Sequence, residues 1–304
     1  MIELVVASGK GGTGKTSVLA SLAVLAERAV VADCDVDAAD LHLLLEPVVG
    51  RRTPFYAGHE AVVIPGACTG CAVCVEPCRA GAITLADGRA VVDPLLCEGC
   101  GLCVHLCEEK AVAFEPRLNG EWYVSDTRVG PMVHARLEPG GESSGKLVTL
   151  VRSEARRLAA ERGLGMVLVD GPPGVGCPVI ATMGGASRLL AVAEPTTSGV
   201  HDLERLLELA AHFEVPAVVV VNKWDLYPDL TRAIEELAER RGAAVLGRIP
   251  YDLAVTTAQL AGRTAVEMGG AGAEAMVRIF ERLRPMLDAG RRQLPQTRGA
   301  SAPP

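Results

Sequence analysis

The sequence predicts an α/β protein with a mostly parallel sheet, helices on both faces of the sheet and a small inserted α+β domain. Three observations predict this fold class. Short apolar runs alternate with amphipathic stretches along most of the 304 residues, as expected for buried parallel strands joined by crossover helices. A glycine-rich loop follows the first apolar run, and two cysteine-rich runs interrupt the alternation beyond residue 58.

The opening elements are a strand at residues 2–7, a glycine-rich loop, a helix that starts at residue 16, and a strand at 28–33. From Gly58 to Pro116 the periodicity is lost, and 117–146 is predicted to hold loops and short strands. After this connection the alternation resumes. The strands expected there cover 165–170, 188–195, 216–223 and 243–250, and the helices cover 147–163, 200–213, 230–242 and 273–288.

Composition limits the functional class. The chain has a formal net charge of -7, only 3% aromatic residues and no basic stripe, which argues against a nucleic-acid partner. No apolar run reaches the ~18 residues of a membrane span, and the N-terminus lacks signal-peptide features, so we expect a cytoplasmic protein. The 10 cysteines of such a protein are expected to be metal ligands or catalytic groups rather than disulfides.

Residues 9–16, GKGGTGKT, fit the phosphate-binding pattern G-x-x-x-x-G-K-[ST] between a predicted strand and a predicted helix. Backbone N–H groups of such a loop and the N-terminus of the following helix bind phosphate oxygens. Lys15 would neutralise the β- and γ-phosphates, and the Thr16 hydroxyl would ligate Mg²⁺. The nucleotide contacts predicted in this segment are Gly9, Lys10, Gly11, Gly12, Thr13, Gly14, Lys15, Thr16 and Ser17.

Lys10 adds a second lysine to this loop. The sequence KGGTGKT resembles the deviant Walker A loop of the MinD/Mrp family, which includes the nitrogenase iron protein and the ParA partitioning ATPases. The resemblance implies an ATPase in which Lys10 reaches the nucleotide of a partner subunit, so that hydrolysis depends on dimer closure around two ATP molecules. The partner would be a second copy of the chain or a related ATPase. Lys10, Lys15 and Asp35 are the catalytic residues that this resemblance implies.

Two further segments resemble the switch regions of that family. Residues 32–45 resemble switch I, which implies that Asp35 orients or activates the attacking water near Mg²⁺. Residues 167–174, VLVDGPPG, resemble the Walker B strand and switch II. Asp170 would then bind Mg²⁺ through water, and Gly171 would sense the γ-phosphate. The implied magnesium site consists of Thr16, Asp35 and Asp170.

The base-contacting segments of the family have counterparts at 220–223, VVNK, and 249–252, IPYD. The resemblance implies contacts from Asn222, Lys223, Pro250 and Asp252, with Asn222 on the adenine edge. The run NKWD at 222–225 also fits the guanine-reading motif N-K-x-D of GTPases, in which Asp225 would bind the base. Because the phosphate loop carries the lysine signature of the ATPase branch, we expect ATP rather than GTP.

The cysteine runs have identical spacing, C-x2-C-x2-C-x3-C, at 68–78 and 97–107. Duplication of this pattern is typical of two-cluster bacterial ferredoxins, in which the fourth cysteine of each run serves the other cluster. One [4Fe–4S] cluster is therefore predicted on Cys68, Cys71, Cys74 and Cys107. The second is predicted on Cys97, Cys100, Cys103 and Cys78. Zinc is the alternative, but a zinc site gives no reason for the fourth cysteine to recur in both runs.

The runs depart from the ferredoxin pattern at one position each. The proline that usually follows the fourth cysteine is replaced by Arg79 in the first run and by Glu108 in the second. We expect this departure to affect reduction potential or solvent access rather than to remove a cluster.

The whole chain resembles a MinD-superfamily P-loop ATPase with an inserted ferredoxin domain. The ATPase domain is predicted at 1–57 and 117–289, the ferredoxin domain at 58–116 and a disordered tail at 290–304. The resemblance implies an ATP-hydrolysing enzyme whose nucleotide state gates electron transfer from two clusters to a partner protein. An iron–sulfur carrier or assembly ATPase is one alternative, and a MinD-like regulatory switch with the clusters as sensor is the other.

Overall fold

The computed structural model describes residues 1–141 and 144–293. Within these ranges, no helix combines the length and apolar character needed to cross a membrane. The described chain divides into two compact units. The first comprises residues 1–52, 123–135 and the chain from 145 onward, and the second comprises 53–122 and 136–144. The predicted insertion at 58–116 lies within the second unit, which also takes in residues on either side of it.

A nine-stranded sheet, in the order β11-β10-β9-β1-β8-β2-β7-β6-β3, organises the first unit. Its six short strands pair in parallel, and most are near-continuous apolar runs because helices cover both faces. The predicted α/β class with a mostly parallel sheet is confirmed. These strands are β1 Ile2–Ala7, β2 Val30–Asp33, β8 Met166–Asp170, β9 Arg188–Ala193, β10 Ala217–Asn222 and β11 Ala244–Ile249.

The remaining three strands of the sheet were not predicted as such. β3 Val48–Val63 and β6 Val112–Thr127 each have 16 residues and continue along the chain from one unit into the other. β7 Gly130–Leu137 pairs in parallel with β2 and follows β6 after two residues, a connection that only antiparallel strands can make. The prediction of loops and short strands at 117–146 is therefore wrong for most of that range. Most of β3 is exposed, so its sequence has neither an apolar run nor a regular alternation.

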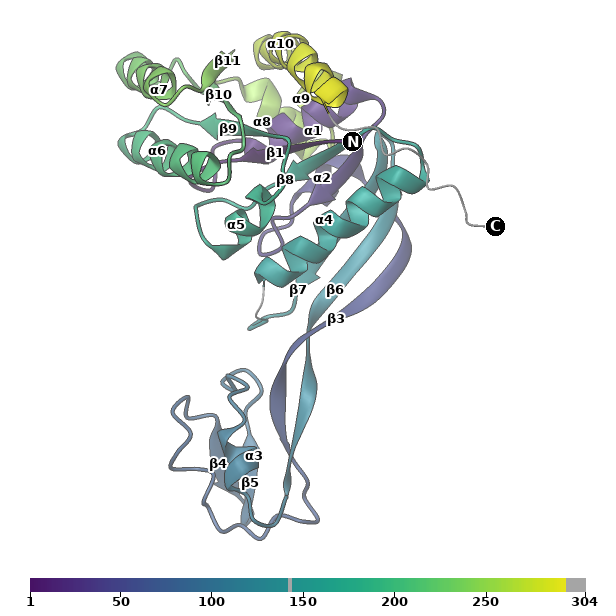
Figure 1. Cartoon of the computed structure of the whole chain (residues 1–304), viewed down its shortest axis with the longest axis vertical. Helices are drawn as coiled ribbons and strands as arrows, with labels where there is room; N and C mark the ends of the chain where they lie inside the picture. Colours follow the sequence, from purple (N-terminus) through teal and green to yellow (C-terminus); the bar gives the residue numbers. More distant parts are fainter. Residues whose placement is uncertain (142–143, 294–304) are drawn as a thin grey trace. The chain divides into compact units, whose positions relative to one another are not determined.

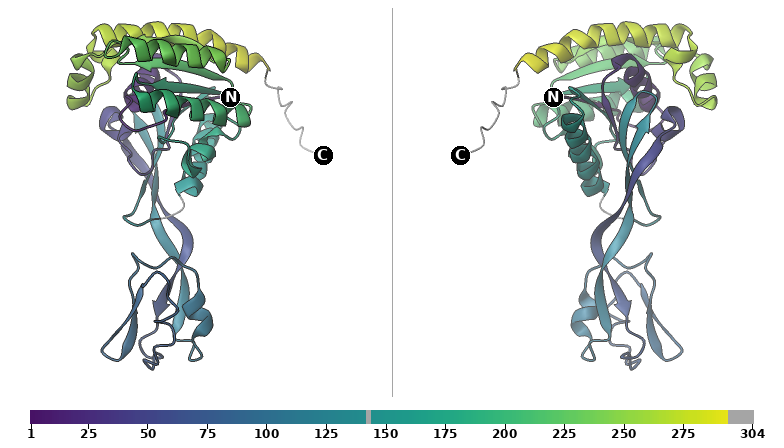
Figure 2. Two further views of the ribbon diagram at one scale, coloured as in Figure 1. Left: turned by 90° about the vertical axis from the view of Figure 1, so that its left-hand side faces the viewer. Right: turned by 90° about the vertical axis from the view of Figure 1, so that its right-hand side faces the viewer.

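Helices lie on both faces of the sheet (Figures 1 and 2). One face carries α1 Lys15–Ala26, α2 Leu41–Leu45, α8 Leu253–Leu260, α9 Ala265–Met268 and α10 Ala271–Gln293. The other face carries α4 Ser144–Glu161, α5 Cys177–Met183, α6 Thr197–His212 and α7 Pro228–Arg240. Because α10 runs through residue 293, the tail predicted at 290–304 was placed four residues too early, and its remainder lies outside the described residues.

The second unit contains the short antiparallel pair β4 Ile83–Ala86 and β5 Arg89–Val92, and the helix α3 Leu102–Leu106. One buried apolar cluster of this unit consists of Cys74, Ile83 and Ala90, against which several partly buried side chains pack. Three of those side chains are themselves cysteines of the two runs: Cys68, Cys78 and Cys103.

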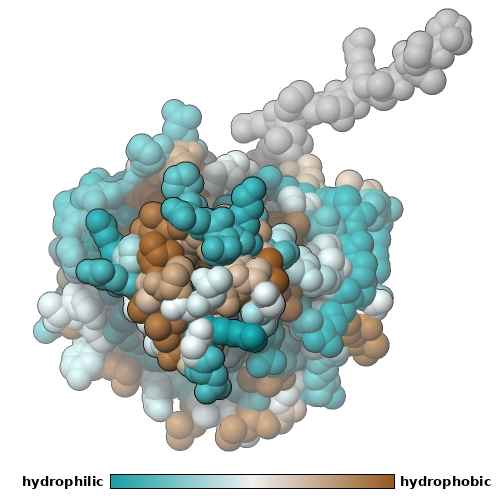
Figure 3. Space-filling view, turned by 90° about the horizontal axis from the view of Figure 1, so that it is seen from below, coloured by the Kyte–Doolittle hydropathy of each residue, from teal (hydrophilic) through white to brown (hydrophobic). Residues whose placement is uncertain are grey.

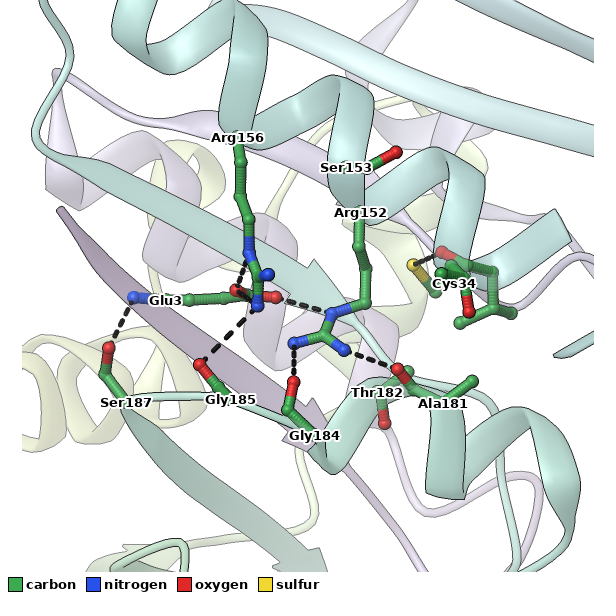
Figure 4. Close-up of polar contacts among 12 residues, drawn as sticks. Glu3, Cys34, Arg152, Ser153, Arg156, Ala181, Thr182, Gly184, Gly185 and Ser187 are labelled. Carbon is green, nitrogen blue, oxygen red and sulfur yellow. Dashed lines mark hydrogen bonds and ion pairs between the residues drawn. The ribbon is translucent and has the colours of Figure 1, made fainter. Parts of the chain in front are cut away.

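A buried carboxylate fastens α4 to the centre of the sheet (Figure 4). Glu3 lies on β1 between β8 and β9 and is only 3% exposed. Its Oε1 accepts from Arg152 Nε at 2.6 Å, and its Oε2 accepts from Arg156 Nε at 2.5 Å. Arg152 also donates to the carbonyls of Ala181 and Gly184 at the C-terminal end of α5. One ion-pair network therefore joins β1, α4 and α5.

We expect Glu3→Gln to lower the free energy of unfolding by about 3 kcal/mol, because removing one partner of a buried ion pair leaves its charges uncompensated. The measurement is urea denaturation of the nucleotide-free chain followed by circular dichroism. Glu274→Gln is the matched control, since Glu274 and its partner Arg278 are both exposed and 3.7 Å apart. That exchange should cost less than about 1 kcal/mol. Equal stability losses in the two variants would contradict the expectation.

Candidate functional site

The glycine-rich loop between β1 and α1 borders a cavity of about 490 Å³ in the first unit. The cavity lies beyond the carboxyl ends of the parallel strands, where open α/β sheets bind ligands. Most of the predicted nucleotide contacts line it: Gly11, Gly12, Thr13, Gly14, Lys15, Thr16, Ser17, Asp35, Asn222, Lys223, Pro250 and Asp252. The predicted residues that do not line it are Gly9, Lys10, Asp170 and Gly171.

Lys15 lies between two carboxylates at the base of the loop. Its Nζ is 2.7 Å from Asp170 Oδ1 and 3.3 Å from Asp35 Oδ2. Burial by itself would lower the pKa of Lys15, but Asp170 and Asp35 outweigh it and the pKa is raised. The Thr16 hydroxyl donates to Asp170 Oδ2 at 2.9 Å. The structure thus brings together the oxygen atoms predicted to hold Mg²⁺, which prefers such ligands.

Asp33, at the end of β2, adds a third carboxylate beside this group. It is 1% exposed, and its Oδ2 has no hydrogen-bond partner among the described residues. Burial raises the pKa of Asp33 well above its usual range, and the charge of Asp170 adds to the effect. A buried carboxylate oxygen without a partner is costly. The other oxygen of Asp33, Oδ1, accepts from the Asp35 N–H at 3.2 Å, so Asp33 holds the backbone of Asp35 beside Lys15.

Lys10 points away from the cavity, toward the C-terminal end of β9. Its Nζ is 2.5 Å from Glu194 Oε1 and donates to Thr196 Oγ1 at 3.0 Å. Glu194 Oε2 also pairs with Lys223 Nζ at 3.0 Å, and Lys223 donates to the Gly12 carbonyl. Burial alone would raise the pKa of Glu194, but the two lysines hold it below its usual range. Glu194 belongs to none of the motifs described above, and so it was not predicted.

The two segments predicted to contact the base are far from the glycine-rich loop in the sequence, but both border the same cavity. The first of them also contacts the loop directly. Asn222 Nδ2 donates to the Thr13 carbonyl at 2.7 Å. Asp252 caps α8 by accepting from the Ala254 N–H at 2.9 Å. Asp225, the residue on which the GTP alternative depends, accepts from the Tyr251 N–H at 2.7 Å and is not part of the cavity lining.

Several residues of the cavity wall were missed at the sequence level. They come from α8, its flanks and α10: Tyr251, Val255, Thr256, Gln259 and Met276. They belong to no motif. The sequence could have indicated most of them only by their position, within two helical turns after the segment 249–252. Gln259 Nε2 donates to Ser17 Oγ at 2.7 Å, so α8 is also held to the start of α1.

The second unit gathers the cysteines. A cavity of about 330 Å³ is lined by Cys78, Cys97, Cys100 and Cys103, the four ligands predicted for one cluster. Cys74 also borders it. The residue that replaces the usual proline, Arg79, lies on the same wall.

The other predicted ligand set converges on Cys74. Burial raises the pKa of the Cys74 thiol, and the nearby Cys71, Cys68 and Cys107 add to the effect. Two backbone N–H groups donate to sulfur, from Ala90 to Cys68 Sγ at 3.4 Å and from Ala111 to Cys107 Sγ at 3.2 Å. Such hydrogen bonds to sulfur are a feature of cluster sites. Cys107 from the second run therefore lies with three cysteines of the first.

Among the described residues, no three or more His, Cys, Asp or Glu side chains are arranged to hold a single metal ion. Zinc requires four ligands that converge on one centre, whereas the thiolates of a [4Fe–4S] cluster bind four different irons. The cysteines of the two runs thus lie within one unit, and two of their sulfurs accept from backbone N–H groups.

The loop glycines yield a test of the nucleotide site. Gly14 has a φ of +87°, and a Cβ there would lie 2.3 Å from Asn222 Nδ2. We expect Gly14→Ala to weaken Mg-ATP binding at least about tenfold, because a non-glycine residue at such a φ costs on the order of 1–3 kcal/mol before the clash is counted. Isothermal titration calorimetry measures the affinity. Gly184→Ala is the control, since Gly184 does not line the cavity and its Cβ would meet no atom within 4 Å. Similar affinities for both variants would be inconsistent with this geometry.

Comparison with known proteins agrees with the fold and the loop. The sequence profile described as the CobQ/CobB/MinD/ParA nucleotide binding domain matches residues 4–265. The septum site-determining protein MinD of Pyrococcus horikoshii, solved with Mg-ADP, superposes with a TM-score of 0.57 at 17% identity, covering 95% of this chain and 98% of that one. The cell division ATPase MinD of Pyrococcus furiosus gives 0.56 at 18% identity, with 94% and 99% covered. At these identities the superpositions show the fold alone.

Sequence relatives extend over most of the chain. The uncharacterized protein MJ0578 of Methanocaldococcus jannaschii is 37% identical over 227 residues, which cover 73% of this chain and 78% of the relative. The light-independent protochlorophyllide reductase iron-sulfur ATP-binding protein of Chloroflexus aurantiacus is 37% identical over 68 residues only, 22% of this chain and 25% of that protein.

Proposed function

The chain belongs to the CobQ/CobB/MinD/ParA nucleotide-binding family, and from this premise we propose an ATPase whose nucleotide state gates electron transfer from two [4Fe–4S] clusters to a partner protein. The observation that carries the proposal is the gathering of each predicted cluster's four cysteines within one unit of a nucleotide-binding chain. The short similarity to an iron-sulfur ATP-binding protein supports it.

At the nucleotide site, the residues around Lys15 exchange partners when a triphosphate binds. Lys15 leaves Asp35 and Asp170, to which it is now bonded, and neutralises the β- and γ-phosphates. Thr16 and Asp170 would hold Mg²⁺, which would neutralise charge at the phosphates. Asp35 would then be free to orient the attacking water. The carboxylates that now bind a lysine would thus bind the cation and position the nucleophile.

The proposal includes a dimer, formed with a second copy or with a related ATPase. Lys10 is 29% exposed and bonded to Glu194 within its own chain. To contact a partner's nucleotide, its Nζ must leave Glu194. The exchange is electrostatically reasonable, because nucleotide phosphates carry more negative charge than one carboxylate. Glu194 would then retain Lys223, which keeps the Gly12 carbonyl in place.

In the second unit, the eight cysteines would hold the clusters, which supply one-electron transfer. The unit also offers a surface to a partner protein. On the nearest part of the view from below, which is the second unit, apolar side chains gather beside hydrophilic ones (Figure 3). Several large apolar side chains of this unit are more than 40% exposed, among them Val73, Leu85, Val91, Leu95 and Leu96. Exposed apolar patches with polar rims are typical of protein-binding sites.

The proposal is tested by an anaerobic EPR redox titration of the iron-loaded chain with and without Mg-ATP. We expect two [4Fe–4S] signals and a nucleotide-dependent shift in the potential or line shape of at least one. Two signals whose potentials and line shapes are the same with and without Mg-ATP would favour the regulatory alternative. Absence of stable cluster signals would favour a carrier or zinc site.

Lys15→Ala should lower ATP turnover by about 100-fold or more, because the cation opposite the developing phosphate charge is lost. Both clusters should remain, since no described contact joins Lys15 to a cysteine. Phosphate release and iron content measure the two effects. Lys146→Ala, an exposed lysine of the same unit, is the control. Loss of iron together with turnover would mean that the two sites are not separable.

A further inference from the structure

A buried arginine lies beside the cysteine cavity. Arg117 belongs to β6 within the second unit and is 8% exposed. Arginine is rarely buried to this extent unless it is paired. Its Nη1 donates to the Cys97 carbonyl at 3.0 Å, and its Nη2 donates to the Gly140 carbonyl at 3.0 Å. The guanidinium is therefore held against the backbone of a predicted cluster ligand.

Its positive charge is not neutralised by an anion within the described residues. All of the hydrogen bonds given for Arg117 go to backbone carbonyls, and no described carboxylate lies within 4.0 Å of it. Among the described residues, Arg152 is buried to a similar extent but differs in this respect, because it is paired with Glu3. A buried cation without a carboxylate partner stabilises the more negatively charged state of any nearby group.

Reduction of a [4Fe–4S] cluster adds one electron and makes the group one charge more negative. Net charge and hydrogen bonding around a cluster set its reduction potential. Cys97, whose carbonyl accepts from Arg117, lines the cavity together with Cys78, Cys100 and Cys103. The charge of Arg117 would therefore stabilise the reduced state of the cluster held by these four cysteines.

We propose that Arg117 is a positioning residue that raises the reduction potential of the cluster on Cys97, Cys100, Cys103 and Cys78 through its buried positive charge. This inference rests on the proposed cluster-binding function. Arg117 lies outside both cysteine runs, yet it would make that cluster easier to reduce. A purely structural arginine would join β6 to the cysteine loop and leave the potential unchanged.

The test is an EPR redox titration, with dithionite as the reductant, of the full iron-loaded chain and its Arg117 variants. Arg117→Gln and Arg117→Met remove the charge, and Arg117→Lys retains it with a different geometry. We expect both uncharged variants to shift one cluster to lower potential, the one perturbed by Cys100→Ser, and to leave the other in place. Arg117→Lys should keep a potential close to that of the parent chain.

Arg89→Gln is the matched control, because Arg89 lies near Cys68 but is exposed, so solvent screens its charge. It should shift neither potential as far as Arg117→Gln does. An unchanged potential in the uncharged variants overturns the proposal, as does an equal shift in Arg117→Lys. Loss of iron from both uncharged variants, with iron retained in Arg117→Lys, also overturns it and assigns Arg117 to holding the site together. Failure of the parent chain to hold two clusters would refute the proposed function itself.

Discussion

The ion pair between Lys15 and the carboxylates of Asp35 and Asp170 is the contact on which the nucleotide site depends. It joins three elements that are adjacent only in the folded sheet: the loop after β1, the end of β2 and the end of β8. β8 lies between β1 and β2, so the three chain segments emerge side by side. In this state the lysine supplies the positive charge that the crowded carboxylates require. Nucleotide binding must replace that charge with another.

The same unit links this site to α4. Gly174, in the segment that resembles switch II, donates to the Ser8 carbonyl at the start of the phosphate loop. α5 follows three residues later, and Arg152 of α4 binds two carbonyls at its C-terminal end. α4 in turn continues directly from the last residues of the second unit. Glu3 anchors Arg152 to the central strand, so the same ion-pair network holds α4 and the end of α5 to the sheet beside the phosphate loop.

The sequence predicted those parts of the fold whose signals are local. β1, the loop and α1 were found because an apolar run, a glycine pattern and a helical periodicity follow one another within 26 residues. β3 was missed because most of its residues are exposed, which removes the burial pattern by which strands are identified. Residues such as Glu194 and Arg117 were missed for another reason. Their roles depend on contacts with Lys10 and with the Cys97 carbonyl, and no motif records those contacts.

The two units differ in what stabilises them. The first buries a large apolar core between the sheet and its helices. The second is smaller, and one of its buried clusters consists of Cys74, Ile83 and Ala90. Small domains of this kind usually require disulfides or metal in addition to apolar burial.

The described cysteines form no disulfide. Thiolates of the two runs would consequently serve the fold and the chemistry together, since binding energy at such sites contributes to folding. If the proposed clusters form, the exchange of Cys78 and Cys107 between the two runs would join the two halves of this unit.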